Sequence, residues 1–231
     1  GADSVVPFEN TNNNPHKGND FPDTVLINEI VNKGDNIRLS GQDYKFGETV
    51  VENGMLIDPA IIGAIASFGI NEVNVIRKPI VSLISTGNEL VMPGEKLNEG
   101  QIYDSNSYAI SAAINSSGAE CKMHKILSDK KEDVDKLYEN CSQSDLIVTI
   151  GGVSKGDFDL IRDAISSKGN IDFWGINMKP GKPLAFGKVV LNNKEVFHIG
   201  LPGNPVSSYV CFELFIRPIL LKMQGMKNIH R

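Results

Sequence analysis

The sequence is poor in the residues that form disulfides, zinc sites and catalytic triads. It has only three cysteines and four scattered histidines in 231 residues. Cys121, Cys141 and Cys211 are odd in number and widely spaced, so they indicate neither a disulfide framework nor a metal site. No serine or cysteine stands in a clear pairing with a histidine base. We therefore expect a reducing, cytoplasmic compartment and chemistry that depends on acids, lysines and backbone amides.

Long hydrophobic runs are also missing. The longest apolar stretches, such as Ile61–Ile70, are interrupted by glycine or serine and stop well short of the roughly 18 residues that a membrane-spanning helix needs. Acidic residues outnumber basic ones by 28 to 23, which gives a net charge of -5. An acidic chain has no general attraction for nucleic acid or for an anionic membrane. We expect no membrane span, no nucleic-acid partner and a small-molecule substrate.

Charge and turn residues divide the chain into two parts. Residues 1–79 carry 11 acidic and 6 basic side chains, and turn sequences at residues 33–35 and 40–42 separate their short runs of valine and isoleucine. This pattern predicts a smaller, β-rich N-terminal domain of hairpins over residues 1–76. It should contain one helix over Ala60–Phe68, with Asp58 as its N-cap.

From residue 77 onward, apolar strands alternate with helices, which is the pattern of a βαβ sheet. We predict the α/β fold class, with a three-layer α/β/α domain and a mostly parallel sheet over residues 77–225, and a short tail over 226–231. The predicted strands are Val81–Ser85, Glu120–Lys125, Leu146–Ile150, Phe173–Met178, Leu184–Lys188 and Val196–Ile199. The predicted helices are Ser105–Ser117, Lys131–Cys141, Phe158–Ser167 and Pro205–Met223.

Four loops follow predicted strands, where an open α/β sheet binds its ligand. The loop after Leu146–Ile150 begins with Gly151 and Gly152 and continues through Ser154 into two acids, Asp157 and Asp159. Glycines allow tight turns that direct N–H groups at an anion. The two carboxylates are suited to a magnesium ion that bridges a phosphate, although one of them has the alternative role of capping the helix that follows.

The segment Met178–Pro183 displays two lysines on either side of a Pro-Gly turn. Because both prolines stiffen the backbone, Lys179 and Lys182 are held as a fixed pair of charges. Lysine is a compact point charge that suits a small tetrahedral oxyanion. The alternative is an exposed turn with two solvated lysines.

The remaining two loops are polar helix entrances. In Gly200–Ser208, Asn204 is a good N-cap and Ser207 lies in the first helical turn, where an anion can bind. The other loop has two parts, Ser85–Glu89 and Tyr103–Asn106. Their polar side chains are suited to hydrogen bonds with a nucleotide or heterocycle, while helix capping is the competing explanation for Asp104 and Ser105.

These stretches, in this order, closely resemble the molybdopterin molybdenumtransferases and the gephyrin E domain. The matching stretches are Gly1–Val6, Asn36–Asp43, Ser85–Leu90, Gly100–Asn106, Gly151–Asp159, Lys179–Pro183 and Leu201–Ser207. The resemblance implies a transferase of molybdenum cofactor biosynthesis, elongated, multidomain and usually a homodimer. Such an enzyme takes adenylylated molybdopterin and molybdate as substrates, releases AMP with Mg2+, and leaves molybdenum on the dithiolene. The resemblance also implies a possible adenylyltransferase partner.

The resemblance assigns roles residue by residue. Asp157 and Asp159 would be catalytic and hold the metal, and Lys179 and Lys182 would be catalytic and bind molybdate together with Ser207. The residues that would bind the molybdopterin nucleotide are Thr86, Glu89, Asp104, Ser105, Asn106, Gly151, Gly152, Ser154, Gly203 and Asn204.

The sequence departs from the family at two of these motifs. Asn88 stands where the family commonly has an acid, which weakens a role for this position in metal binding, and Gln42 stands where the family often has glutamate. The resemblance further implies that a helical N-terminal segment and a C-terminal β domain of the family lie outside this chain. Because part of the molybdate site and of the dimer contact would come from them, we expect this chain to bind nucleotide but not to insert molybdenum alone.

Two other functions compete with this one. A molybdopterin adenylyltransferase-like nucleotide-binding domain resembles the second half, but it typically carries a Gly-Gly-Thr-Gly loop and has no hairpin domain. A gephyrin-like scaffold that binds partner peptides is compatible with the sequence as an added role.

Overall fold

The computed structural model describes residues 1–12, 23–124, 131–152 and 165–229, and the side chains of 131–135 and 173–174 are not described. The chain divides into two compact units, residues 1–52 and residues 53–231, which are described separately. Within the described residues, no helix is both long and apolar enough to cross a membrane.

The first unit contains turns and short antiparallel contacts. A 3-10 helix, η1 (Phe8–Asn10), precedes an isolated antiparallel bridge between Thr11 and Ile27. The predicted turns are present, since Gly34 and Gly41 both have positive φ angles. The predicted hairpin strands are not formed in the described residues of this unit. A two-stranded hairpin is marginal without a packed layer, and here apolar side chains such as Phe46 are fully exposed.

The second unit begins with a capped helix. Helix α1 (Pro59–Ser67) lies within one residue of its predicted bounds, and its N-cap is Asp58, whose Oδ1 accepts a hydrogen bond from Ile61 N at 2.8 Å. Proline at the first helical position needs no N–H partner, which suits this start.

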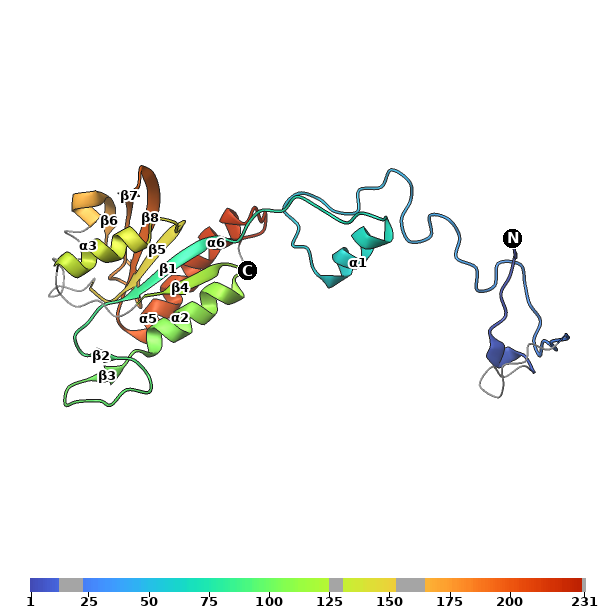
Figure 1. Cartoon of the computed structure of the whole chain (residues 1–231), viewed down its shortest axis with the longest axis horizontal. Coiled ribbons are helices and arrows are strands. Elements are labelled where there is room, and N and C mark those ends of the chain that lie inside the picture. Colours follow the sequence, from blue (N-terminus) through green and yellow to red (C-terminus); the bar gives the residue numbers. More distant parts are fainter. Residues whose placement is uncertain (13–22, 125–130, 153–164, 230–231) are drawn as a thin grey trace. The chain divides into compact units, whose positions relative to one another are not determined.

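A six-stranded sheet organises the rest of this unit (Figure 1). Its order is β4 (Glu120–Met123), β1 (Ile80–Ser85), β5 (Leu146–Ile150), β8 (Lys194–Leu201), β7 (Ala185–Leu191) and β6 (Gly169–Trp174). The first four strands are parallel, and β7 is antiparallel to both of its neighbours. The mostly parallel sheet and the α/β class are thus confirmed.

The last three strands differ from prediction in their bounds. Strand β6 begins four residues before the predicted start at Phe173 and ends at Trp174, because Gly175 at φ 88° turns the chain. Strands β7 and β8 are longer and form a hairpin around Asn192 and Asn193, which both adopt positive φ. Asparagine tolerates that conformation, as a tight hairpin turn requires. A two-stranded parallel sheet of β2 (Leu90–Val91) and β3 (Ile102–Tyr103) was not predicted.

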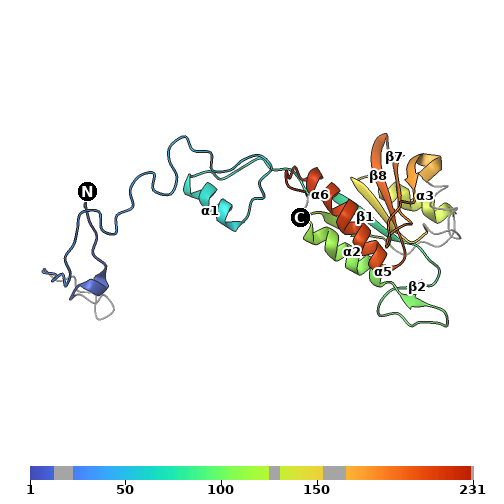
Figure 2. The same ribbon diagram turned by 180° about the vertical axis from the view of Figure 1, so that it is seen from behind.

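Helices cover both faces of the sheet (Figures 1 and 2). Helix α2 (Ser105–Ser116) lies on one face with a continuous helical run of α5 (Pro205–Cys211), the π-helical turn η3 (Phe212–Ile216) and α6 (Arg217–Met223). Helix α3 (Lys131–Asn140) lies on the other face. Residues 165–168 are helical, and the rest of the helix predicted over Phe158–Ser167 lies outside the described residues. The three-layer arrangement is therefore as predicted.

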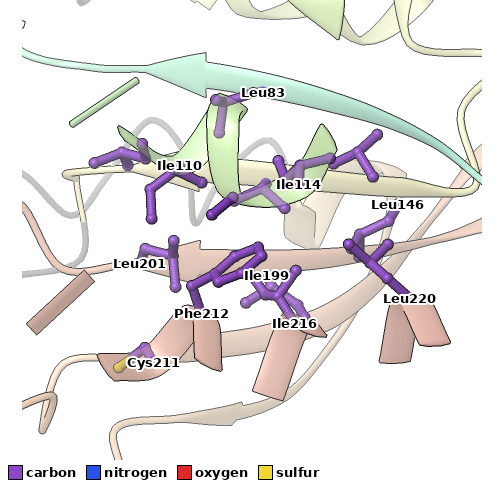
Figure 3. Packing of buried hydrophobic residues seen from close by; sticks show 14 of the residues in the cluster. Leu83, Ile110, Ile114, Leu146, Ile199, Leu201, Cys211, Phe212, Ile216 and Leu220 are labelled. Atoms are coloured by element: carbon purple, nitrogen blue, oxygen red, sulfur yellow. The ribbon is translucent and has the colours of Figure 1, made fainter. Parts of the chain in front are cut away.

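The main core lies between the sheet and the α2 side. Alternate side chains of the strands enter it, such as Leu83 and Ile199, and they meet Ile110 and Ile114 of α2 and Phe212 after α5 (Figure 3). Period-two alternation in the strands and helical spacing in α2 produce this interface. The core thus holds the strand ends and the start of α5 in a fixed geometry.

Candidate functional site

The loops that carry the sequence motifs meet at one edge of the sheet. Strands β1, β5 and β8 are adjacent and parallel, so their carboxyl ends share that edge. The lysine loop, residues 175–184, joins β6 to β7, and β7 begins at the same edge because Ala185 pairs with Gly200 near the end of β8. Ligands of open α/β sheets bind at such an edge.

The glycine loop, which begins with Gly151 and Gly152, is in close contact with Thr86. Thr86 N donates to Ile150 O at 3.0 Å, and Gly151 N donates to Leu201 O at 3.0 Å. A Cβ atom on Gly151 would lie only 2.7 Å from the backbone oxygen of Thr86, and the residue has φ 85°. On the other side, the Cβ position of Gly203 lies 3.9 Å from Gly151 Cα. Only glycine at position 151 allows the three loops to approach this closely.

The start of α2 is joined to the loop after β8. Asn106 Nδ2 donates to Gly203 O at 2.7 Å. Asp104 is buried, and its Oδ1 accepts from Ser107 N at 3.0 Å, so it caps α2 as the alternative explanation proposed. Ser105 is exposed beside it in the first helical turn.

The start of α5 is also capped. Asn204 Oδ1 accepts from Ser207 N at 3.1 Å and from Ser207 Oγ at 3.3 Å. Ser208 Oγ donates to Pro202 O, which fixes the loop before the helix. Because the Ser207 hydroxyl proton is directed at Asn204, the side chain must rotate before it can donate a hydrogen bond to an anion.

The lysine loop packs against α5. Lys179 and Lys182 are exposed, while Gly181 between them is buried with φ 104°. The Cβ position of Gly181 is 2.7 Å from Cys211 Sγ and 3.9 Å from the backbone oxygen of Ser207. The structure thus brings the turn between the two lysines next to the helix that carries Ser207.

Glu89 lies at the entrance to the small sheet. Its side chain is exposed and folds back over Gly87, whose Cβ position would be 2.6 Å from Glu89 Oε1. Its backbone oxygen accepts from Ile102 N at 2.9 Å. In the first unit, Gln42 Oε1 accepts from Leu39 N at 3.1 Å, a bond for which glutamate would supply the same acceptor atom.

Three of the predicted site residues, Ser154, Asp157 and Asp159, lie outside the described residues. Within the described part of the chain, no group of three or more His, Cys, Asp or Glu residues could hold a metal ion. Residues 152–156 spell Gly-x-Ser-x-Gly, which in hydrolases can mark a nucleophilic serine. Of the two described histidines, His124 bonds to Ser82 and His198 is fully buried.

No sequence pattern indicates what supports the lysine loop from beneath. Cys211 and Met178 contact Gly181, but a lone cysteine within an apolar helix reads as a core residue. Gly181 between two prolines was the only available signal, since it marks a turn without saying what packs against it. All three cysteines are free thiols, and burial raises the pKa of the Cys211 thiol.

Comparison with known proteins gives the family. A family model described as probable molybdopterin binding domain matches residues 82–222, and the MoeA N-terminal region (domain I and II) matches residues 1–69. The chain belongs to the molybdopterin molybdenumtransferase family. The resemblance noted from the motifs is thereby confirmed.

Individual relatives agree with this assignment. The chain is 38% identical over 206 residues to a molybdopterin molybdenumtransferase of Haemophilus influenzae, which covers 89% of this chain and 50% of that protein. It is 36% identical over 238 residues to molybdopterin molybdenumtransferase 2 of Mycobacterium tuberculosis, with coverage of 100% and 56%. A solved molybdopterin biosynthesis moea protein from Pyrococcus horikosii matches with a TM-score of 0.72 and 34% identity, over 98% of this chain and 54% of that one. The chain spans about half the length of the curated relatives it matches.

Proposed function

We propose that this chain carries the nucleotide and oxyanion sites of a molybdopterin molybdenumtransferase. The reaction is the transfer of molybdenum from molybdate to adenylylated molybdopterin, with release of AMP. The observation that carries the proposal is the meeting of four motif-bearing loops at one sheet edge, with the lysine loop seated on the helix of Ser207. The names of the relatives support the same activity.

The nucleotide would bind over the glycines of the central strands. Gly151, Gly152 and Gly203 have no side chains there, so a phosphoanhydride can approach the backbone closely. Thr86, Glu89, Ser105, Asn106 and Asn204 supply polar groups on the flanking loops. Asp104 is buried and caps α2, so it would act by fixing the helix start rather than by touching the ligand.

The oxyanion would bind at the lysine loop. Lys179 and Lys182 are exposed and lie on a turn whose Gly181 packs against α5. The backbone that carries the two charges therefore has little freedom to move. Two ammonium groups match the double negative charge of molybdate. Ser207 would complete the site by rotating its hydroxyl away from Asn204. The lysines would hold molybdate beside the dithiolene while AMP leaves.

Magnesium binding would depend on Asp157 and Asp159. The described residues do not themselves make up a metal site. When bound, magnesium would neutralise charge on the phosphates. In a chain extended to the length of its relatives, Asp157→Asn with Asp159→Asn is expected to slow magnesium-dependent AMP release more than it weakens nucleotide binding. Unchanged turnover would show that both acids serve only as helix caps.

The test of the oxyanion site is a calorimetric titration with sodium molybdate, with the nucleotide present, of the chain extended to the length of its relatives. Lys179→Gln and Lys182→Gln are each expected to weaken binding by about tenfold, the loss of one charge-assisted contact of about 1.4 kcal/mol. Folding should be nearly unchanged, because both side chains are exposed. Lys222→Gln, at an exposed position on α6, is the matched control. Molybdate binding that survives both lysine changes would contradict the proposal.

We also propose that the α/β domain begins near residue 77, that the tail begins near 226 and that the N-terminal domain ends at 76. Arg77 supports the first boundary, because its guanidinium makes hydrogen bonds of 2.6 and 2.7 Å to Asp145 before β5. These bonds hold the pKa of the Asp145 carboxyl well below its usual range. Limited proteolysis should therefore cut before Arg77 and leave residues 77–225 intact.

We propose a cytoplasmic homodimer that receives adenylylated molybdopterin from an adenylyltransferase. The free thiols suit a reducing compartment. Light scattering of the chain extended to the length of its relatives would measure the oligomeric state.

A further inference from the structure

We propose that Cys211 is the positioning residue of the oxyanion site. Its buried side chain sets the height of Gly181 above α5, and thereby the places of Lys179 and Lys182. This inference rests on the proposed function, since it names what supports the lysine loop of that site.

The first observation is steric. Gly181 is buried, and a Cβ atom there would be 2.4 Å from Met178 Cε and 2.7 Å from Cys211 Sγ. Distances below 3.0 Å are closer than real Cβ contacts, so the loop lies in direct contact with the sulfur. Gly181 also has φ 104°, a conformation that other residues rarely adopt. The loop therefore has no room to settle nearer to the helix.

The second observation is polar. Cys211 Sγ lies 3.8 Å from Gly181 O, and its thiol donates a weak hydrogen bond to that oxygen. Cys211 is 0% exposed, so water does not compete for this carbonyl from the side of the thiol. The size of the sulfur thus limits how closely the lysine loop approaches α5, and the hydrogen bond of the thiol keeps the loop and the helix in contact.

The third observation is the position of Cys211 along the helix. It follows Ser207 by four residues, so both side chains lie on the same face of α5. It also belongs to the main core cluster, at whose edge it appears in Figure 3. One rigid helix therefore positions the serine directly and the two lysines through the sulfur. A displacement of about 1 Å at such a contact can cost about a hundredfold in rate.

Substitutions at Cys211 separate size from hydrogen bonding. Cys211→Leu adds volume against Gly181, so we expect molybdate affinity to fall by about tenfold or more. Cys211→Ser keeps a small donor and should retain most of the affinity, while Cys211→Ala should fall between the two. Gly181→Ala approaches the same contact from the loop and should resemble Cys211→Leu. Nucleotide affinity should stay within about twofold of wild type in all four variants, because the glycine loops are left unchanged.

Cys141 offers a matched control. It is also 0% exposed, but it belongs to the second core cluster, on the opposite face of the sheet. Cys141→Leu imposes the same increase in volume and should lower the melting temperature without altering molybdate affinity. A structural role alone would affect both cysteine positions alike.

The experiment is calorimetric titration of the chain extended to the length of its relatives with sodium molybdate and, separately, with adenylylated molybdopterin. Wild type, Lys179→Gln and Lys182→Gln are measured first: if both variants bind molybdate as wild type does, the proposed function fails. If Lys179→Gln is weakened but Cys211→Leu and Gly181→Ala bind as Cys141→Leu does, the positioning role of Cys211 is wrong. If Cys211→Leu does not fold, Gly181→Ala against Cys211→Ser decides the same question. The positioning role is supported if Cys211→Leu and Gly181→Ala lose molybdate affinity but keep nucleotide affinity, and if Cys211→Ser keeps most of its molybdate affinity.

Discussion

The two faces of the sheet are built differently. The face under α2 and the α5 to α6 run is filled by apolar side chains such as Leu83, Ile114 and Phe212. The face under α3 also buries polar groups, namely Thr149, His198 and Tyr138. Among the described residues, the two hydroxyls and both ring nitrogens of His198 have no hydrogen-bond partner. Unpaired buried polar groups lower stability, so these atoms should reduce the contribution of the α3 face to the stability of the domain.

This difference separates support of the site from the rest of the domain. The contacts that hold the candidate site, Asn106 to Gly203 and Cys211 to Gly181, come from helices on the apolar face. On the α3 face, Ser82 joins Ser144 at 2.7 Å and His124 at 2.9 Å, but this chain of hydrogen bonds lies away from those contacts. Substitutions on the α2 face should therefore lower both stability and ligand affinity, whereas substitutions on the α3 face should lower stability alone.

The largest expected effect is on the apolar face. Phe212→Ala removes a 1% exposed ring from the main cluster, and it should lower the free energy of unfolding by about 3–5 kcal/mol. Because α5 ends beside Phe212, molybdate affinity should fall as well. Leu137→Ala on the α3 face should cost about 2–5 kcal/mol and leave molybdate affinity unchanged in the folded fraction. Chemical denaturation and calorimetry measure both quantities, and equal loss of affinity would remove the distinction between the faces.

An intermediate effect is expected from pH. Burial lowers the pKa of His198 to about 3, so the folded protein keeps this ring neutral while the unfolded chain protonates it near 6.5. The contribution of the neutral His198 ring to the free energy of unfolding is therefore fully present above pH 6.5. It is lost as pH falls toward 3, by at most about 1.4 kcal/mol per pH unit. His198→Leu should reduce the slope of the free energy of unfolding against pH in this range by the amount that corresponds to one bound proton. A slope identical to wild type would show that the ring binds its proton equally in the folded and unfolded states.

The smallest expected effect is a gain. Thr149→Val and Tyr138→Phe each remove an unpaired buried hydroxyl with little change of shape, and each should raise the free energy of unfolding by up to about 1 kcal/mol. The matched change on the other face is Ser208→Ala, which breaks the bond to Pro202 O and should be destabilising. If Thr149→Val and Tyr138→Phe are destabilising too, a buried water pairs those hydroxyls.

The sequence predicted the parts that depend on local pattern. Strand β5 has the predicted bounds, and Asp58, Asp104 and Asn204 are the predicted helix caps, because capping requires only a short polar side chain before a helix. The hairpin of β7 and β8 was missed although Asn192 and Asn193 signal it. The support of Gly181 by Cys211 depends on residues 30 positions apart, a contact that no local pattern contains.

The central claim is that the sheet edge binds the molybdopterin nucleotide, and Gly151 tests it most directly. A Cβ at Gly151 meets the Thr86 backbone oxygen at 2.7 Å, whereas at Gly69, with a similar φ of 76°, it meets nothing within 4 Å. Gly151→Ala and Gly69→Ala thus carry similar backbone strain, but only the first disturbs the edge. In a titration with adenylylated molybdopterin, we predict that Gly69→Ala binds as wild type and that Gly151→Ala binds at least about tenfold more weakly. A folded Gly151→Ala chain with wild-type affinity would contradict the placement of the site.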